Sequence, residues 1–318
     1  MTVLFLKTLR AIYKLVAGQP HIDKPLCTQG PELASKAIKD ILLSEKPAMI
    51  ARLGSTELTS IANYVSVVSG RRPWLQYIKG TTQPWWWNEE NIRQMAIGAG
   101  FFPAEIPAIE EFCELMLRDM TQVDLLGSWL PMENQFAEQL RRSQKVDLEL
   151  LNPYFSTIPW TRALTGKKVL VIHPFASSIE AQYLKRKLLF QDDLLPDFDL
   201  KTIKAVQSIA GEKTEFSNWF AALDSMKIAM DKCDYDICLV GCGAYGFPLA
   251  AHAKRMGKKG FHLGGSLQLL FGIRGKRWEN PAYNPIYNYS ELMNEHWIKP
   301  SDDERPISAH KVEGACYW

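Results

Sequence analysis

Short apolar runs alternate with longer stretches of helical periodicity along most of the chain. The clearest runs are 48–53, 169–172 and 237–240, which have the length and composition of strands buried on both faces. Each run precedes a segment, such as 58–65, in which apolar residues recur at intervals of three and four residues, as in an amphipathic helix. The pattern predicts an α/β fold, with a single Rossmann-like domain whose mostly parallel sheet is flanked by helices.

The pattern also divides the chain. Residues 1–30 are predicted to form an amphipathic helix and a loop, and residues 31–318 the α/β domain. From Trp278 onward the sequence is rich in Tyr, Trp and Pro, which predicts an irregular aromatic tail packed on that domain. Segment 73–107 is aromatic and irregular and suggests an insertion over a cleft. Its tryptophans at 85–87 suit a sugar-stacking surface, packing in the core or a protein interface.

Charges interrupt the apolar N-terminal segment. Lys7, Arg10 and Lys14 fall on one face of a helix, and apolar residues occupy the rest of its circumference. Such a helix suits an anionic membrane surface, but it also suits packing on the domain. The charges argue against a signal peptide, and no uncharged apolar run reaches the length of about 18 residues typical of a membrane span. The sequence is therefore consistent with two alternatives for residues 1–18: peripheral membrane contact, or packing on the domain.

Composition excludes one class of partner. The chain has 37 Lys and Arg against 35 Asp and Glu, a formal net charge of +2, and it contains no basic stripe interleaved with aromatic residues. Nucleic-acid binding is therefore not expected. The six cysteines are scattered without C-x-x-C pairs, which favours reduced thiols and a cytoplasmic protein, with any membrane contact at the inner face.

The most informative motif is a complete G-x-G-x-x-G from Gly241 to Gly246, placed between an apolar run and a segment with helical pattern. Glycines in that setting let the backbone approach an anion at a helix N-terminus, which predicts bound phosphate. A dinucleotide site would also need an Asp or Glu at the end of the next strand, where His262 stands. An NAD(P)-dependent oxidoreductase is thus a weaker interpretation than another phosphate-binding site. A further alternative is that the glycines only permit tight packing of helix and strand.

Other residues with reactive or charged side chains follow the remaining predicted strands, where open parallel sheets bind ligands. Arg52 ends the first strand, and Glu57 lies in the first turn of the next helix; a salt bridge between them would satisfy both. His173 and His262 each end a strand and suit acid, base or phosphate-contact roles, or simple packing. The last predicted turn carries Gly264, Gly265 and Ser266, followed by the basic residues Arg274, Lys276 and Arg277.

Two of these motifs carry a resemblance. Arg52-x-Gly54-x-x-Glu57 resembles the R-x-G-D-G-E motif of the GT-D-fold glycosyltransferases, and the run from Gly241 to Trp278 resembles uncharacterised relatives found with polysaccharide assembly proteins. The likeness covers roughly residues 30–318. It implies a glycosyltransferase that moves a sugar from a nucleotide-diphosphate donor, such as a UDP-sugar, to a glycan or lipid-linked acceptor in surface polysaccharide or glycoconjugate synthesis. It also implies that Mn²⁺ or Mg²⁺ assists the departing diphosphate.

The strand-end positions and the resemblance together give candidate roles for residues of this chain. Glu57, Arg52 and His173 are the predicted catalytic residues, and Glu57 is the predicted metal ligand. The family motif has an Asp where this chain has Ser55, a poorer ligand for a hard cation. Either basic residues neutralise the leaving group instead, or the chain only binds nucleotide sugars without turnover. The residues predicted to bind the donor are Gly54, Ser55, Gly241, Gly243, Tyr245, Gly246, Gly264, Gly265, Ser266, Arg274, Lys276 and Arg277.

Overall fold

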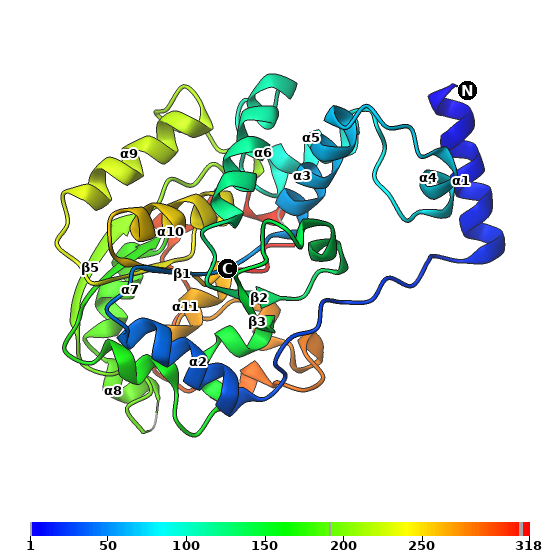
Figure 1. Cartoon of the computed structure of the whole chain (residues 1–318). Helices are drawn as coiled ribbons and strands as arrows, with labels where there is room; N and C mark the ends of the chain where they lie inside the picture. The colour runs from blue at the N-terminus through cyan, green and yellow to red at the C-terminus, as the bar shows by residue number, and fades with distance from the viewer. Residues whose placement is uncertain (1, 191, 312–313) are drawn as a thin grey trace.

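Seven parallel strands form the centre of the fold in the computed structural model, which describes residues 2–190, 192–311 and 314–318 (Figure 1). Met1, the first residue of the predicted N-terminal helix segment, lies outside that description. The sheet order is β3-β2-β1-β7-β6-β4-β5, and every pairing is parallel. The predicted α/β, Rossmann-like architecture is therefore confirmed. The strands are β1 (Ala48–Arg52), β2 (Leu125–Ser128), β3 (Gln144–Asp147), β4 (Lys168–His173), β5 (Asp199–Lys204), β6 (Ile237–Val240) and β7 (Lys259–His262).

Helices cover both faces of the sheet. One layer contains α3, α6, α9 and α10, and the opposite layer contains α2, α7, α8 and α11 (Figure 1). Among the described residues, no helix is long and apolar enough to cross a bilayer. The α-helices are α1 (Val3–Ala17), α2 (Pro31–Leu43), α3 (Ser55–Val68), α4 (Trp74–Lys79), α5 (Glu89–Ile97), α6 (Ile106–Met120), α7 (Ala176–Tyr183), α8 (Arg186–Leu189), α9 (Trp219–Asp231), α10 (Gly246–Arg255), α11 (Leu267–Leu270) and α12 (Lys276–Glu279).

Alternation along β1, β4 and β6 explains their apolar runs. In β1, Met49 and Ala51 pack into one helical layer, whereas Ile50 between them packs into the other. Successive side chains of a strand point to opposite faces, so a strand covered on both faces favours apolar residues at successive positions. Strand β7 is also fully buried but carries Lys259 and His262, so it shows no such run. The central layers also approach closely: a Cβ on Gly260 of β7 would lie 2.1 Å from the carbonyl oxygen of Ala250 in α10.

The structure differs from the sequence pattern at the edges of the sheet. Strand β3 was not predicted, because only Val146 of its four residues is fully buried. A 3₁₀ helix over Pro131–Phe136 lies between β2 and β3, where a parallel α/β sheet usually has a longer α-helix. Segment 73–107 contains two helices, α4 and α5, where an irregular insertion was expected. Short or half-exposed elements carry too little periodicity to be recognised.

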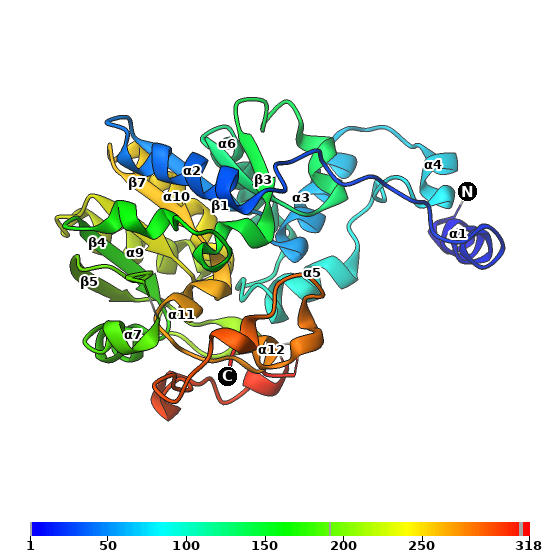
Figure 2. The same ribbon diagram turned by 90° about the horizontal axis from the view of Figure 1, so that it is seen from below.

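The C-terminal tail lies on the domain beside α7 and α11 (Figure 2). Buried Gln182 of α7 donates from Nε2 to the carbonyl oxygens of Gly272 and His296, at 3.2 and 3.0 Å. Buried Glu304 accepts a hydrogen bond of 3.1 Å from the backbone N–H of Ser178. These contacts bring the last residues of the chain to the carboxyl edge of the sheet.

Candidate functional site

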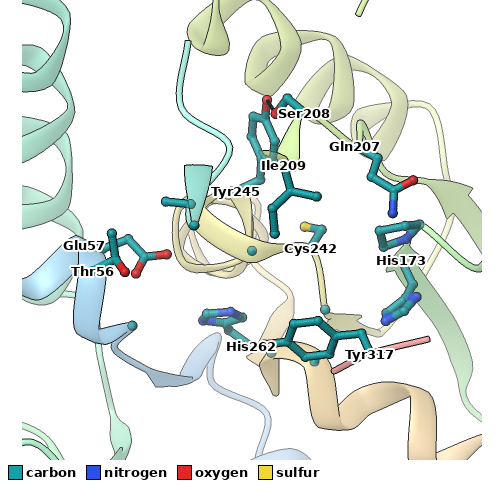
Figure 3. A pocket seen from close by; sticks show the side chains of 18 of the residues that line it. Thr56, Glu57, His173, Gln207, Ser208, Ile209, Cys242, Tyr245, His262 and Tyr317 are labelled. Atoms are coloured by element: carbon teal, nitrogen blue, oxygen red, sulfur yellow. Dashed lines mark hydrogen bonds between the residues drawn. The ribbon is translucent and has the colours of Figure 1, made fainter. Parts of the chain in front are cut away.

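A cavity of about 290 Å³ opens at the carboxyl edge of the sheet (Figure 3). That volume lies just below the range of about 300–1,000 Å³ typical of ligand sites. Helix α5 and the tail residues Tyr317 and Trp318 close its sides. Strand-end turns supply most of the wall, through Arg52 and Gly54 after β1, Trp129 after β2, His173 at β4, Gln207 and Ser208 after β5, Gly241 and Gly243 after β6, and His262, Gly264 and Gly265 at β7.

Most of the residues predicted from the sequence meet at this cavity. The four that do not line it are Gly246, Ser266, Arg274 and Lys276. Ser266 borders a smaller adjoining cavity, Lys276 is exposed, and Arg274 donates from Nη2 to the carbonyl oxygen of Trp297 at 2.9 Å. The predicted residues that line it are Arg52, Gly54, Ser55, Glu57, His173, Gly241, Gly243, Tyr245, Gly264, Gly265 and Arg277.

Arg52 places a positive charge in the wall. Its guanidinium lies 5.4 Å from the ring centroid of Trp129, and the Trp129 indole is itself held by a 3.0 Å hydrogen bond to the carbonyl oxygen of Leu53. Across the part of the chain that the structure describes, no carboxylate comes within ion-pairing distance of Arg52, so the salt bridge to Glu57 is not formed. A partly buried cation without a paired carboxylate favours an anionic ligand.

The Glu57 carboxylate is folded back over the start of α3. Gly54 is the N-cap of that helix, and a Cβ at Gly54 would lie 1.9 Å from Oε2 of Glu57. A side chain at position 54 would therefore displace the carboxylate, which explains the pairing of Gly54 with Glu57 in the sequence. Figure 3 shows Glu57 on one side of the cavity and His173 on the opposite side.

The three glycines of the G-x-G-x-x-G turn have different functions in the fold. A Cβ at Gly241 would lie 2.6 Å from the carbonyl oxygen of Gly264, and one at Gly246 would lie 2.4 Å from the His262 ring, so these two permit close packing. Gly243 has a φ of +58°, a left-handed conformation. A Cβ added to it would lie 3.9 Å from the nearest other atom. Only Gly243 therefore combines a glycine-requiring backbone with open space at the cavity.

The second glycine turn is covered by the tail. The ring of Tyr317 lies against Gly265, where a Cβ would come within 2.2 Å of it. The guanidinium of Arg277 lies 5.0 Å from the Tyr317 ring centroid, and its Nη2 lies 3.1 Å from Sγ of Cys316. Arg277 thus faces the cavity while holding the tail in place.

Two buried histidines line the cavity as opposite tautomers. Nδ1 of His173 accepts a 3.0 Å hydrogen bond from the backbone N–H of Phe175, so its neutral ring carries the proton on Nε2. Nδ1 of His262 lies 3.1 Å from the carbonyl oxygen of Arg52, which can only accept, so its proton is on Nδ1. Burial lowers the pKa of both rings to about 3, helped at His262 by the charge of Arg52. His173 can donate a hydrogen bond from Nε2, but both rings are weak bases.

These pKa values predict a pH-dependent stability. The ordinary histidine pKa is 6.5, so between about pH 6.5 and 3 the unfolded chain binds more protons than the folded one. The stability that the two neutral histidines contribute is therefore complete above pH 6.5 and is lost as the pH falls from 6.5 towards 3. We expect the free energy of unfolding, measured with urea, to drop by about 1–2 kcal/mol per histidine from roughly pH 7.5 to 5. His173→Gln and His262→Gln should each flatten this dependence, whereas exposed His21→Gln should not; equal slopes in all four proteins would refute the assignment.

An acidic residue that the sequence did not indicate lies beside the cavity. The adjoining cavity, of about 70 Å³, is lined by Glu149 and shares Arg52, Gly265, Arg277 and Tyr317 with the larger one. Burial raises the pKa of Glu149, while a hydrogen bond from the hydroxyl of Tyr289 and the charge of Arg52 oppose the shift. Glu149 follows the unpredicted strand β3, and its position after a strand end is the one signal that could have identified it.

Other predicted groups are engaged in the fold. The Tyr245 ring stacks on Trp219, with ring centroids 4.9 Å apart, and its hydroxyl lies 3.0 Å from Oγ of Ser208 (Figure 3). The tryptophans at 85–87 pack against Tyr77 and Tyr64 and do not line the cavity. The ring of Tyr245 and the tryptophan cluster therefore support the wall rather than present open stacking surfaces.

The acidic groups near the cavity do not form a preassembled metal site. Within the described ranges, no three His, Cys, Asp or Glu side chains are grouped so that they could hold a metal ion. Ser55 is exposed at the first position of α3, and Glu57 is the carboxylate that lines the larger cavity. A divalent ion here would fit only as Mg²⁺ often does, on one carboxylate with substrate phosphates and water completing the shell.

Comparison with known proteins gives no assignment: no family model, no curated protein and no solved structure matches the chain significantly.

Proposed function

We propose that this protein is a glycosyltransferase that transfers a sugar from a nucleotide-diphosphate donor to a glycan or lipid-linked acceptor in surface polysaccharide or glycoconjugate synthesis. The observation that carries the proposal is the meeting of two motifs: the one that resembles GT-D-fold enzymes, and the glycine-rich run that resembles uncharacterised relatives found with polysaccharide assembly proteins. Arg52, Gly54 and Glu57 line the same cavity as the glycine turns after β6 and β7, although they are far apart in the sequence. Open parallel sheets bind ligands at this edge.

The donor diphosphate is assigned to the wall formed by Arg52, Arg277, Gly243 and the start of α3. Two guanidiniums supply fixed positive charge, and the first N–H groups of a helix lack partners within the helix. His173 adds a neutral N–H donor at Nε2. Such donors stabilise the negative charge that develops on a departing diphosphate. A divalent ion on Glu57 and the diphosphate would supply further charge neutralisation.

Glu57 is the proposed general base. In a direct displacement, an acceptor hydroxyl oxygen bonds to the anomeric carbon as the bond from that carbon to the diphosphate oxygen breaks. The diphosphate leaves with the electron pair, and the hydroxyl proton passes to the Glu57 carboxylate. The two histidines lining the cavity, with pKa values of about 3, are poorer bases at neutral pH for this step than their residue type suggests.

A second candidate is a nucleotide-sugar-binding protein without turnover. It is favoured by Ser55, which replaces the acidic residue of the resembled motif, and by the isolation of Glu57 from other acidic metal ligands in the described chain. An oxidoreductase is less favoured, because β7 ends at His262 and offers no carboxylate for a ribose.

The test is a panel of nucleotide sugars, with and without Mn²⁺, assayed for binding by calorimetry and for donor hydrolysis. Binding with hydrolysis supports the transferase, whereas tight binding without turnover on any acceptor supports the second candidate. Quenching of protein fluorescence by NADH, with no response to nucleotide sugars, would redirect the assignment to an oxidoreductase. A crystal grown with UDP and Mn²⁺ would show which turn holds the diphosphate.

A further inference from the structure

Helices α1 and α4 form a unit that projects from the domain. Both views show the pair set to one side of the sheet and its helical layers, joined to them by extended segments (Figures 1 and 2). Leu6 of α1 is buried in this contact, and the guanidinium of Arg10 lies 4.7 Å from the ring centroid of Tyr77 in α4. We call residues 2–17 and 71–80 the α1–α4 unit.

Packing on α4 uses only part of the apolar surface of α1. Leu6, Leu9 and Tyr13 share the inner face and are the buried or partly buried apolar positions. The arc that adjoins this face and continues to the far side of the helix remains apolar and exposed. Its members and their exposed fractions are Leu4 (75%), Phe5 (51%), Ile12 (51%), Leu15 (86%) and Val16 (84%).

The charges of the α1–α4 unit are of one sign. Lys7, Arg10 and Lys14 lie on the flank of α1 between its inner face and its exposed arc. Arg71 and Arg72 precede α4 and Lys79 ends it, while Trp74 and Leu75 at its start are about half exposed. Residues 2–22 and 58–88 contain no Asp or Glu, although the whole chain has nearly equal numbers of acidic and basic residues.

We propose that the α1–α4 unit docks on an anionic lipid bilayer, with α1 lying in the interface and its exposed arc inserted among the lipids. An apolar arc flanked by Lys and Arg is the pattern of helices that bind membrane surfaces in this way. A second copy of the chain fits less well, because the cations of both copies would meet with no carboxylate in either unit to pair with them. This docking surface is distinct from the cavity and does not depend on the proposed transferase activity.

The experiment is flotation of the full-length protein with vesicles of phosphatidylcholine alone or with about one-third phosphatidylglycerol. We expect binding to the anionic vesicles to be at least about tenfold stronger and to weaken at high salt, because exposed charges are screened. Lys7→Gln with Lys14→Gln should weaken it about 25-fold, since each cation near an anionic surface contributes roughly a factor of five. Leu15→Glu with Val16→Glu should abolish it.

Leu184→Glu is the matched control, because Leu184 is equally exposed (82%) but lies outside the unit. It should bind as the unaltered protein does, and circular dichroism should show all variants folded, since the changed residues are on the surface. The proposal is overturned if the unaltered protein does not float with anionic vesicles, or if the variants of α1 bind undiminished. Concentration-dependent dimerisation that Leu15→Glu removes, without vesicle binding, would assign the arc to a second copy instead. Nucleotide-sugar binding should be the same in every variant, so loss of docking is distinguishable from failure of the proposed function.

Discussion

Glu57→Gln is expected to reduce donor turnover by about 10²- to 10⁴-fold, the usual contribution of a general base. Glutamine keeps the shape of the side chain but cannot accept the acceptor's proton, and its amide is a poorer ligand for a divalent ion. The measurement is the rate of transfer or donor hydrolysis under saturating donor, with donor affinity determined separately. Because the change is in turnover, affinity for the nucleoside diphosphate should be affected much less.

Two further variants test whether the position of the Glu57 carboxylate matters as well as its presence. Gly54→Ala keeps Glu57, but the new Cβ would lie 1.9 Å from Oε2 in its present place, so the carboxylate must move and turnover should fall. Glu111→Gln changes an exposed carboxylate on α6, outside the cavity, and should leave turnover unchanged. Full activity in Glu57→Gln would remove Glu57 from the mechanism.

Arg52→Ala is expected to weaken binding of UDP by about 30-fold or more, since removing one partner of a desolvated charge pair typically costs about 2–5 kcal/mol. The same change should leave the stability of the ligand-free protein unaltered or slightly increased, because the described structure gives Arg52 no carboxylate partner. A residue that served only the fold would show the opposite pattern. Calorimetric titration and urea unfolding at one salt concentration measure the two effects.

Conservative and distant substitutions complete that comparison. Arg52→Lys keeps the charge but loses the planar pair of donors, so it should recover only part of the affinity. Arg141→Ala removes an exposed cation that does not line the cavity and should change neither quantity. Unaltered UDP affinity in Arg52→Ala, or destabilisation with no effect on affinity, would contradict the role of Arg52 as an anion-binding residue.

The central strands and the position of the site were predictable because their signals are local. Strands β1, β4 and β6 are buried on both faces and therefore read as apolar runs, and the residues after them had to lie at one edge of a parallel sheet. The half-exposed edge strand β3 has no such run, so Glu149 beyond it was missed. Tyr317 and Trp318 were missed as cavity residues because no periodicity relates the tail to the sheet.

By itself, the sequence determined the fold class, the strand-end turns and the residues with charged or reactive side chains in those turns, since each depends on neighbouring residues. Only the tertiary structure decided which turns share a cavity, because that depends on strand order. It also separated Gly243 from Gly241 and Gly246. It set the tautomer of His262 through the remote backbone carbonyl of Arg52, whereas the opposite tautomer of His173 is set by Phe175, only two residues away. Finally, the tertiary structure left one apolar arc of α1 exposed, because α4 covers only the inner face of that helix. The sequence of α1 could not decide this, because its hydrophobic pattern is the same whether that arc is buried or exposed.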